Sequence, residues 1–567
     1  MSIDDVSFAG KFFLEKYSGG KEVYENLLEM TKDPMKYNEE FLFKILDKNK
    51  NTEYGQKYDF ANIKSIEEYQ SKIPLSEYDD YVEYILSMII DNRSDLITAD
   101  KVDHYSKSSG TLGNPKKIPC SASGQEAIMK YSEYHTFRLI GEKLGLDWID
   151  GRILNLSDFS IDEIKPGITY GAVSSKMMML LGKKIDNYVD LLQSIFTSPI
   201  EGVFPEPSTD VRYIHARFAL MDENIVSVLS SFYSIFLELL VYIEENWKLL
   251  VKDINKGTID ESIKMSNKVR ESLLGKVQPM SERADALNKI FEQGFNEPII
   301  PKIWPKMKIL VGIGTGGFFN YTTKIKKKYA GKDLNLVLLG LISSESIVSV
   351  PIDLNSHSSA ILPDVCFFEF KPVGSDDVYL TLDKLEEGKD YELIITNLSG
   401  FYRYKMGDVI RVTGRYNNLP LIQFLYRSNQ NVSLAGEKTT EIALREAAER
   451  TMRDFNIDLM EFSMYPDPDS SPASYVFFLE INSNPNNVSK EDIRDSIEEK
   501  LSNLNPSYGD KIEKNVLGKM QLHFLHKETY LLYRDLMITK GISSNQLKPP
   551  RIIVNEAQRR FFFALTK

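Results

Sequence analysis

The chain has 567 residues, 42% hydrophobic and 26% charged, a globular composition that excludes disordered, collagen-like and fibrous proteins. This length predicts about three or four domains, or one large enzyme domain with a smaller companion. The formal net charge of -12 at pH 7 excludes a protein that coats bulk nucleic acid, because that attachment requires a basic surface. A small phosphate ligand is compatible with this charge, since a pocket needs only a few cations and backbone amides.

The cysteines and histidines show no spacing typical of a metal centre. The chain has two cysteines, Cys120 and Cys366, and six histidines, so we expect a reducing compartment and no transition-metal chemistry. The N-terminus lacks the pattern of an export signal. Residues Ile225 to Ile243 are long enough to span a bilayer, but serines dilute the run and acidic residues flank it, so we expect a buried core helix. The sequence therefore predicts a soluble, cytoplasmic protein without membrane contact, and a monomer by default.

The first 300 residues are predicted to be mainly helical. Helical patterns punctuated by prolines fill residues 1–100, and long helices are expected over 211–295. Between them lie a helical stretch over 124–144 and a short strand at 152–156. From residue 306 the pattern changes to short β-rich runs, at 307–313, 334–341, 365–370, 391–396, 409–413 and 421–426. The helix-then-strand order within this region predicts that part of the sheet is parallel.

Beyond residue 426 a second pattern of helices and strands begins. Helices are expected at 439–455 and 490–504, the second capped by Ser489. Strands are expected at 460–465 and 475–481, and near 520 and 552. We therefore predict two domains, a large α/β domain over 1–426 and a smaller α+β domain over 427–567.

Two glycine-containing segments are candidates for nucleotide binding. The segment Ser108-Ser-Gly-Thr-Leu-Gly-Asn-Pro-Lys116 offers hydroxyls and amides that could wrap polyphosphate, with Lys116 or Lys117 as the cation. It is not a Walker loop, and a surface turn is the alternative. The segment Gly312-Ile-Gly-Thr-Gly-Gly317 fits a dinucleotide fingerprint, but the next strand lacks the acidic residue that would hold a ribose. Its backbone could instead lie flat against an adenine ring.

Three further candidates carry charge. Ser343-Ser-Glu345 follows a buried strand, where a carboxylate beside phosphate oxygens suits Mg²⁺, although a helix N-cap is an equal alternative. Asp408, after a glycine and before an apolar strand, could accept hydrogen bonds from ribose hydroxyls, or belong to a β-turn. Lys548 precedes two prolines that stiffen its backbone, and the commoner alternative is a solvated lysine.

The order of these motifs is more informative than any one of them. The chain resembles the acyl-adenylate-forming enzymes in the order of four motifs. They are Ser-Ser-Gly-Thr-x-Gly-x-Pro-Lys, Ser-Ser-Glu after a strand, Tyr-Arg-x-x-Gly-Asp and a hinge that begins with an arginine. More closely, the chain resembles the Gretchen Hagen (auxin-responsive) family of acyl acid amido synthetases. The resemblance includes Ile300-Pro-Lys-Ile-Trp-Pro305, Thr396-Asn-Leu-Ser-Gly-Phe-Tyr-Arg-Tyr404 and Lys548-Pro-Pro-Arg551. It implies a large adenylation domain and a small, mobile C-terminal domain.

The resemblance also implies roles for individual residues. The residues implied to bind ATP or AMP are Ser108, Ser109, Thr111, Lys116, Thr315, Gly316, Gly317, Ser343, Ser344, Asp408 and Arg427. Among them, Asp408 would bind the ribose and Arg427 would mark the hinge. Glu345 would help to hold a transient Mg²⁺, and Lys548 would act catalytically on the α-phosphate. The phosphate loop is shorter than the family's usual pattern, so either Lys116 or Lys117 could be its cation. Ile342 replaces the aromatic residue that usually precedes Ser-Ser-Glu.

The implied reaction uses ATP and Mg²⁺ to activate a carboxylic acid as an acyl-adenylate, which an amine, usually an amino acid, then attacks. The residue that deprotonates the amine is not identified. The acyl acid is expected to lie among helices around 169–179 and 215–240, with Tyr170, Val173 and Met177 as tentative lining residues, although such a stretch is more often core. An acyl-CoA ligase would share the first half-reaction. A dehydrogenase and a nucleotide-binding regulatory protein without turnover are alternatives from other classes.

Overall fold

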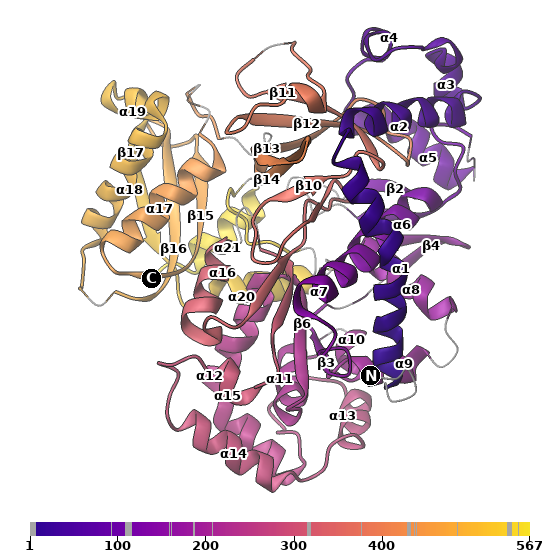
Figure 1. Cartoon of the computed structure of the whole chain (residues 1–567). Helices are drawn as coiled ribbons and strands as arrows, with labels where there is room; N and C mark the ends of the chain where they lie inside the picture. Colours follow the sequence, from indigo (N-terminus) through magenta and orange to yellow (C-terminus); the bar gives the residue numbers. More distant parts are fainter. Residues whose placement is uncertain are drawn as a thin grey trace. The chain divides into compact units, whose positions relative to one another are not determined.

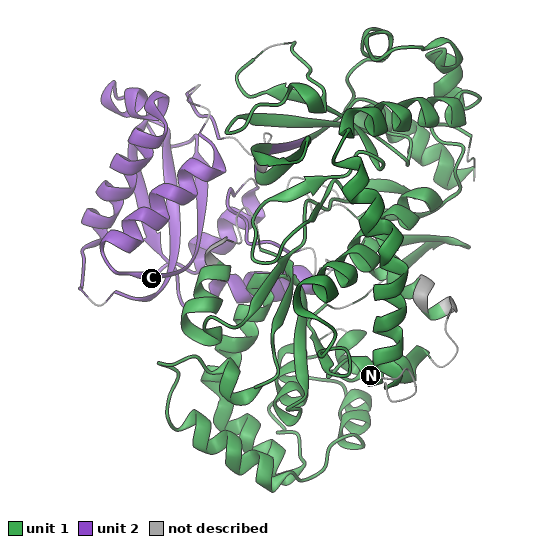
Figure 2. Ribbon diagram, viewed as in Figure 1, with its two compact units in different colours: residues 1–108, 116–406, 410–424 green, residues 109–115, 407–409, 425–567 purple. Residues whose placement is uncertain are grey.

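The computed structural model describes the chain except residues 1–6, 92, 94, 108–115, 158, 160, 185–187, 207, 315–318, 376, 428–431, 436, 438, 485, 541–546 and 554. Contacts divide it into two compact units, coloured in Figure 2. Unit 1 comprises residues 1–108, 116–406 and 410–424, and unit 2 comprises the remainder. Unit 1 is the predicted large α/β part and unit 2 the smaller α+β part, which confirms the expected fold class. The division of the chain at residue 427 into separately moving domains stays a prediction.

Unit 1 begins with helices whose starts are determined by local chemistry. They are α1 (Phe8–Met30), α2 (Pro34–Asn49), α3 (Glu53–Lys57), α4 (Ile66–Lys72) and α5 (Val82–Ile90). The Ser7 hydroxyl and the Asp33 carboxylate accept backbone N–H bonds at the N-termini of α1 and α2. Pro34 occupies the first turn of α2, where a missing N–H costs nothing. The prolines that punctuate the sequence therefore mark helix boundaries here.

A four-stranded sheet in the order β2-β1-β5-β4 follows. Its strands are β1 (Val102–Lys107), β2 (Lys117–Ser121), β4 (Ile161–Lys165) and β5 (Ile168–Gly171). β1 and β2 pair antiparallel, so residues 108–116, the candidate phosphate segment, connect the two strands of a hairpin. Strand β1 also pairs in parallel with β5, which places Tyr105 beside Tyr170. α6 (Ala122–Met129), the π-helical turn η4 (Lys130–His135) and α7 (Thr136–Leu144) continue from β2.

A second sheet has the order β3-β6-β7-β8, and all its pairs are parallel, as predicted for this region. Its strands are β3 (Arg152–Asn155), β6 (Ile225–Phe232), β7 (Ile309–Ile313) and β8 (Asn335–Leu338). The helices that occur between these strands along the chain, labelled in Figure 1 where there is room, are α8 (Val173–Lys184), α9 (Tyr188–Ile195), α10 (Ile200–Val203), α11 (Val211–Met221), α12 (Tyr233–Lys256), α13 (Asn267–Leu274), α14 (Ser281–Phe291), α15 (Ile300–Ile303) and α16 (Phe319–Lys324), with the π-helical turn η6 (Ile325–Ala330).

The expectation of a single core helix over Ile225 to Ile243 is wrong. The first part of the run is β6, paired on both sides with β3 and β7, and the helix α12 begins only at Tyr233. A strand buried on both faces is a continuous apolar run, and periodicity alone does not separate it from a buried helix. No described helix is long and apolar enough to cross a membrane.

The third sheet of unit 1 has six strands in the order β11-β12-β13-β14-β10-β9. They are β9 (Ser349–Pro351), β10 (Ser359–Ile361), β11 (Cys366–Pro372), β12 (Asp390–Asn397), β13 (Tyr404–Tyr416) and β14 (Leu419–Arg427). Four of them match expected strands. Apolar side chains of this sheet and of α2–α5 form one buried cluster, which includes Phe367, Tyr402 and Ile410. The sheet and the N-terminal helices therefore share a core.

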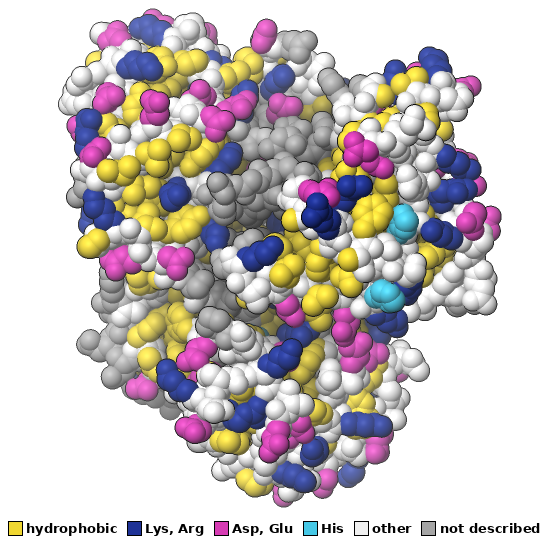
Figure 3. All heavy atoms as spheres, turned by 180° about the vertical axis from the view of Figure 1, so that it is seen from behind, with side chains coloured by type: hydrophobic (Ala, Val, Ile, Leu, Met, Phe, Trp, Pro, Cys, Tyr) yellow, Lys and Arg dark blue, Asp and Glu magenta, His cyan; other side chains and the backbone are white. Residues whose placement is uncertain are grey.

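Unit 2 combines a three-stranded sheet, β15-β16-β17, with helices. The elements are α17 (Glu441–Asp454), β15 (Asp458–Asp467), β16 (Ser474–Ser483), α18 (Lys490–Leu504), α19 (Pro506–Glu513), β17 (Gly518–Phe524), α20 (Thr529–Thr539) and α21 (Glu556–Ala564). The Ser489 hydroxyl accepts the Asp492 N–H at the start of α18, which confirms the predicted cap. The strand expected near 552 is reduced to a single parallel bridge between Ile552 and Met464. On the face that Figure 3 draws, basic and acidic side chains are interspersed.

Candidate functional site

The base of the β1–β2 hairpin carries a group of lysines and tyrosines. Lys107 and Lys117 are register partners at the ends of the two strands. Each ammonium lies 5.9 Å from the centre of the Tyr170 ring on β5. Lys116 is turned to another ring, since its ammonium lies 4.9 Å from the centre of Tyr78. The Tyr78 hydroxyl also accepts the Lys117 N–H at 2.9 Å, so this tyrosine fixes the start of β2.

The predicted phosphate-loop residues Ser108, Ser109 and Thr111 and the predicted adenine-binding residues Thr315, Gly316 and Gly317 lie outside the described residues. Their flanking strands are described. The first set connects β1 to β2, and the second follows β7, a strand of the parallel sheet. Both sets therefore come directly after strands, where backbone amides can serve ligands.

Ser343, Ser344 and Glu345 form a tight turn. Ile342 and Ile347 bridge in antiparallel fashion, and the Ser343 hydroxyl accepts the N–H groups of Glu345 and Ser346, both at 3.2 Å. No helix begins between residues 340 and 348, all of which are described, so the alternative of a helix N-cap is wrong. The turn is half-buried, which leaves its side chains accessible to a ligand.

Two contacts fix this turn in place. The Ser344 hydroxyl donates to the Lys107 carbonyl at 3.3 Å, which joins the turn to the last residue of β1. The buried Asn397 side chain at the end of β12 donates to the Glu345 carbonyl at 2.9 Å. Its own oxygen accepts the N–H groups of Ser399 and Phe401, both at 3.0 Å. The structure thus brings the Glu345 turn to the hairpin that carries the candidate phosphate loop.

Asn397 is a residue whose role the sequence reasoning missed. The segment Thr396-Asn-Leu-Ser-Gly-Phe contributes to the family resemblance, but its sequence alone predicts no chemical role for Asn397. A signal was present, because Asn in Asn-x-Ser-Gly tends to hydrogen-bond its own backbone two residues on. The partner on Glu345 could not be read from sequence, since it depends on how two distant strands pack.

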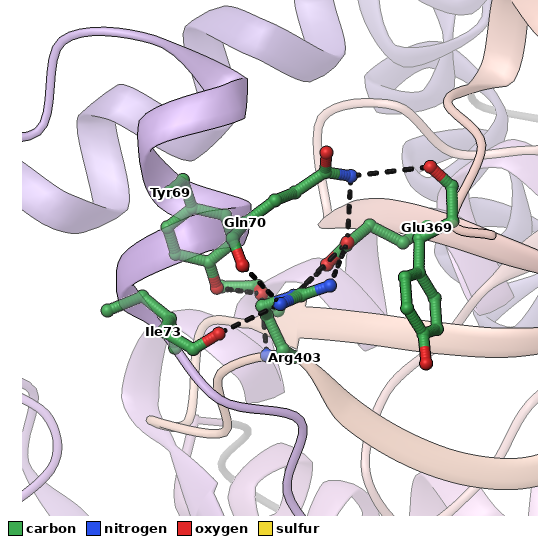
Figure 4. A network of polar contacts seen from close by, with 7 residues as sticks. Tyr69, Gln70, Ile73, Glu369 and Arg403 are labelled. Carbon is green, nitrogen blue, oxygen red and sulfur yellow. Dashed lines mark hydrogen bonds and ion pairs between the residues drawn. The ribbon is translucent and has the colours of Figure 1, made fainter. Parts of the chain in front are cut away.

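Arg403, in the Tyr-Arg-x-x-Gly-Asp motif, precedes strand β13 and makes a buried network of contacts. Its φ is 44°, and its guanidinium is buried against the Glu369 carboxylate, with Nε at 3.0 and 3.1 Å and Nη2 at 2.9 Å. Nη1 donates to the carbonyls of Gln70 and Ile73 at 2.6 and 2.8 Å. Figure 4 shows this network between α4 and the sheet. It supports the chain just before Asp408.

Unit 2 contains the three charged residues predicted for ribose, hinge and catalysis. Asp408 is buried, with 2% of its side chain exposed, and accepts a hydrogen bond from Arg427 Nε at 3.0 Å. Lys548 is exposed as a residue, yet partial loss of water around its ammonium lowers its pKa to about 8, and the nearby positive charge of Arg427 adds to this effect. The carboxylates of Asp408 and Glu441 oppose the shift. These electrostatic couplings place Lys548, Arg427 and Asp408 in one neighbourhood.

The tentative acyl-binding residues fall on two elements. Tyr170 lies on strand β5 and not on a helix, which corrects the expectation for 169–171, while Val173 and Met177 lie on α8. All three are partly buried against the core cluster of the large sheet. Burial raises the pKa of Tyr170 to about 12, so its hydroxyl is neutral at pH 7. The partial burial of these three residues is therefore equally consistent with a role in the core and with a role in an acyl pocket.

The described residues contain no group of three His, Cys, Asp or Glu side chains that could hold a metal ion. A single carboxylate suits a transient Mg²⁺, which keeps several waters and is held largely by substrate phosphates. Glu345, with the hydroxyls of Ser343 and Ser344 beside it, offers only oxygen donors. The donor set of the turn therefore fits Mg²⁺ accompanying ATP.

Comparison with family models gives matches along most of the chain. Residues 23–335 match the N-terminal domain of the GH3 family, residues 359–427 its central domain and residues 441–557 its C-terminal domain. The first match alone covers more than half of the chain. A jasmonoyl–L-amino acid synthetase of Oryza sativa subsp. japonica is 28% identical over 92% of this chain and 93% of its own length. An indole-3-acetic acid-amido synthetase of Arabidopsis thaliana is 27% identical over 93% and 90%.

Solved structures agree with this result. The GH3.15 acyl acid amido synthetase superposes with a TM-score of 0.83 at 25% identity, over 96% of both chains. A 2-hydroxyisobutyryl-CoA ligase in its postadenylation state has a TM-score of 0.50 at 11% identity, over 95% of this chain and 91% of that one. The second similarity concerns the fold alone.

Proposed function

The chain belongs to the GH3 family, as its motifs indicated, and we propose that it is an ATP-dependent acyl acid amido synthetase. It activates a small carboxylic acid as an acyl-adenylate, releases pyrophosphate and joins the acyl group to an amino acid. The relatives named as jasmonoyl and indole-3-acetic acid synthetases support acid–amino acid conjugation as the reaction class. The identities of the acid and the amine are left to experiment.

One structural observation carries the proposal. The Glu345 turn is bonded both to Lys107, the last residue before the candidate phosphate loop, and to Asn397. Two segments far apart in sequence, the end of β1 and the Glu345 turn, are thus joined within unit 1, which supports a role for both near the ATP phosphates.

In the first half-reaction an oxygen of the acyl carboxylate attacks the α-phosphorus of ATP, and the bond to the β-phosphate oxygen breaks. Ser108, Ser109 and Thr111 would hold phosphate oxygens, and Ser343 and Ser344 would contact the α-phosphate. Mg²⁺ held by Glu345 would neutralise charge on the phosphates. Lys548 would donate hydrogen bonds to the negatively charged transition state, an electrostatic role that positioned cations perform well.

In the second half-reaction the amine attacks the activated carbonyl and AMP leaves. Thr315, Gly316 and Gly317 would lie against the adenine, and Asp408 would accept hydrogen bonds from the ribose. Rotation about the Arg427 region would withdraw Lys548 and admit the amine. Tyr170, Val173 and Met177 would line the acyl pocket. The cytoplasmic location and monomeric state stay predictions.

The test is pyrophosphate release with ATP, Mg²⁺ and a panel of carboxylic acids, in the presence of an amino-acid mixture, of CoA or of neither. We expect acid-dependent release that amino acids accelerate, with an amide mass among the products. Acceleration by CoA with a thioester product would instead assign the acyl-CoA ligase alternative. Absence of release from every acid, with ATP still bound, would contradict both.

A further inference from the structure

A short segment just after the predicted catalytic lysine is bound to strand β15 of unit 2. The Met464 N–H donates to the Arg551 carbonyl at 2.8 Å, and the Met464 carbonyl accepts the N–H of the residue two positions further, also at 2.8 Å. The Ser463 hydroxyl donates to the Pro550 carbonyl. Residues 550–553, here called the anchored segment, are therefore held along β15 by backbone and side-chain bonds.

A buried ion pair adds to this attachment. The Arg551 guanidinium pairs with the Glu461 carboxylate of β15, and only 13% and 9% of the two side chains are exposed. The guanidinium also donates to the Phe462 carbonyl at 3.1 Å, and its central carbon lies 4.7 Å from the centre of the Phe462 ring. Burying both charges costs much of the free energy that their attraction gains, so stability alone is a poor account of this pair. Its effect on the position of the chain is the better account.

Two prolines transmit this attachment to Lys548. Pro549 and Pro550 lie between Lys548 and Arg551, and their rings fix φ at about −65°. Pro549 also restricts the backbone of the preceding residue, Lys548, to extended conformations. Few free rotations therefore remain between the bound guanidinium and the lysine. We propose that Glu461, acting through Arg551, positions Lys548 for adenylation, a role that rests on the proposed function.

The surroundings of the lysine agree with an ammonium held in one place. The pKa of Lys548 is lowered first by loss of water and then by Arg427, while the carboxylates of Asp408 and Glu441 act in the opposite direction. An ammonium free to move into water would regain its hydration and its distance from Arg427. Release of the anchored segment is therefore expected to return this pKa toward its ordinary value.

The experiment measures pyrophosphate release by the full chain carrying Glu461→Gln, alone and together with Lys548→Ala. The amide of Glu461→Gln keeps an acceptor but loses the charge that holds Arg551. We expect kcat for adenylation to fall about tenfold with an unchanged KM for ATP, because a small displacement of a catalytic group is costly. If Glu461 acts through Lys548, the double variant is as slow as Lys548→Ala alone, whereas independent effects would multiply.

Two further variants separate positioning from folding. Glu480, the register partner of Glu461 on β16, is also buried and accepts the N–H groups of Glu528 and Tyr530 at the start of α20. Glu480→Gln therefore removes a buried charge from the same sheet, and pyrophosphate release is expected to stay close to that of wild type. Ser463→Ala removes the other side-chain bond to the anchored segment, and is expected to slow adenylation about threefold, as for loss of one neutral hydrogen bond.

A second measurement does not require turnover. The rate at which acetic anhydride labels Lys548, followed by peptide mass spectrometry as a function of pH, reports the pKa of its ammonium. We expect Glu461→Gln to move the midpoint of labelling to higher pH and Glu480→Gln to leave it unchanged.

Two results would overturn the positioning role. One is an equal slowing by Glu461→Gln in the presence and absence of the Lys548 side chain, and the other is an unchanged labelling midpoint in Glu461→Gln. Wild-type protein that releases no pyrophosphate, with a midpoint that still shifts in Glu461→Gln, would contradict the proposed function alone.

Discussion

Two arginine–carboxylate pairs involve the start of strand β13, with Arg403 just before the strand and Asp408 within it, and they differ in burial and in hydrogen bonding. In Arg403–Glu369 both side chains are buried, with 6% and 1% exposed, and the guanidinium also donates to two backbone carbonyls. In Arg427–Asp408 the carboxylate is buried, at 2%, but the arginine is 32% exposed and the Lys548 ammonium lies near. The first pair belongs to unit 1 and the second to unit 2.

The difference separates a structural pair from one suited to ligand exchange. A buried guanidinium that is bonded to a buried carboxylate and to two backbone carbonyls cannot change partner without leaving a charge unpaired in the core. A partly exposed arginine can be replaced by ligand hydroxyls or water at little cost, because its charge stays hydrated. We therefore expect loss of the first pair to damage folding and loss of the second to damage catalysis.

The largest effect is expected for Arg403→Ala. It would leave the Glu369 carboxylate buried without its partner and two carbonyls unsatisfied, which costs about 3–5 kcal/mol. Urea unfolding, or the yield of folded protein if the variant does not fold, measures the effect. As a control, Arg411→Ala removes an arginine from an ion pair with Asp390 in which the arginine is 48% exposed, and is expected to change stability by less than about 1 kcal/mol. If both variants lose the same free energy of unfolding, the buried pair is not more important for folding than an exposed one.

Next comes Lys548→Ala, which probes unit 2. Loss of a positioned cation from a phosphoryl-transfer site is expected to slow adenylation about 10²–10³-fold. Pyrophosphate release measures this step, while urea unfolding should show wild-type stability, because the residue is exposed. Lys567→Ala, at an exposed terminal lysine of the same unit, serves as the matched control. If Lys548→Ala lowers the free energy of unfolding and leaves the rate of pyrophosphate release unchanged, Lys548 has a structural role.

The sequence predicted this contrast only in part, and particular residues show why. Ser489 was identified as a cap because capping depends on residues within one turn. The run from Ile225 was mistaken for a helix because its neighbours, β3 and β7, come from distant segments that no local pattern reveals. Arg403 and Asn397 were seen in a motif, but their partners Glu369 and Glu345 are defined by tertiary packing. The chemical roles came from the family resemblance, since each motif alone had an ordinary alternative.

A smaller effect is expected for Asp408→Asn. The amide keeps an acceptor for Arg427 but loses the charge, so stability should change by about 1 kcal/mol or less, because Arg427 is 32% exposed and its charge stays partly hydrated. Affinity for ATP and for AMP should both fall about tenfold, because ribose hydroxyls would lose a charged acceptor. Calorimetry with Mg·ATP and with AMP measures the two affinities separately. Unchanged affinity for AMP would remove Asp408 from the ribose site.

The smallest effect concerns pH. The pKa of Lys548 is lowered to about 8 by desolvation and by Arg427, so its ammonium begins to deprotonate near neutral pH. Because the protonated form is the one that stabilises phosphate charge, kcat/KM for adenylation is expected to fall about twofold between pH 7 and 8, and more steeply above. This parameter reports the free enzyme, whereas bound phosphates would favour the ammonium and move the fall in kcat to higher pH. Lys548→Arg stays charged throughout, and the same fall in that variant would assign the titration to another group. If the fall in kcat/KM disappears in Lys548→Arg, the titrating group is Lys548. The chemical step then depends on the charges of unit 2 and not on the buried Arg403–Glu369 pair of unit 1.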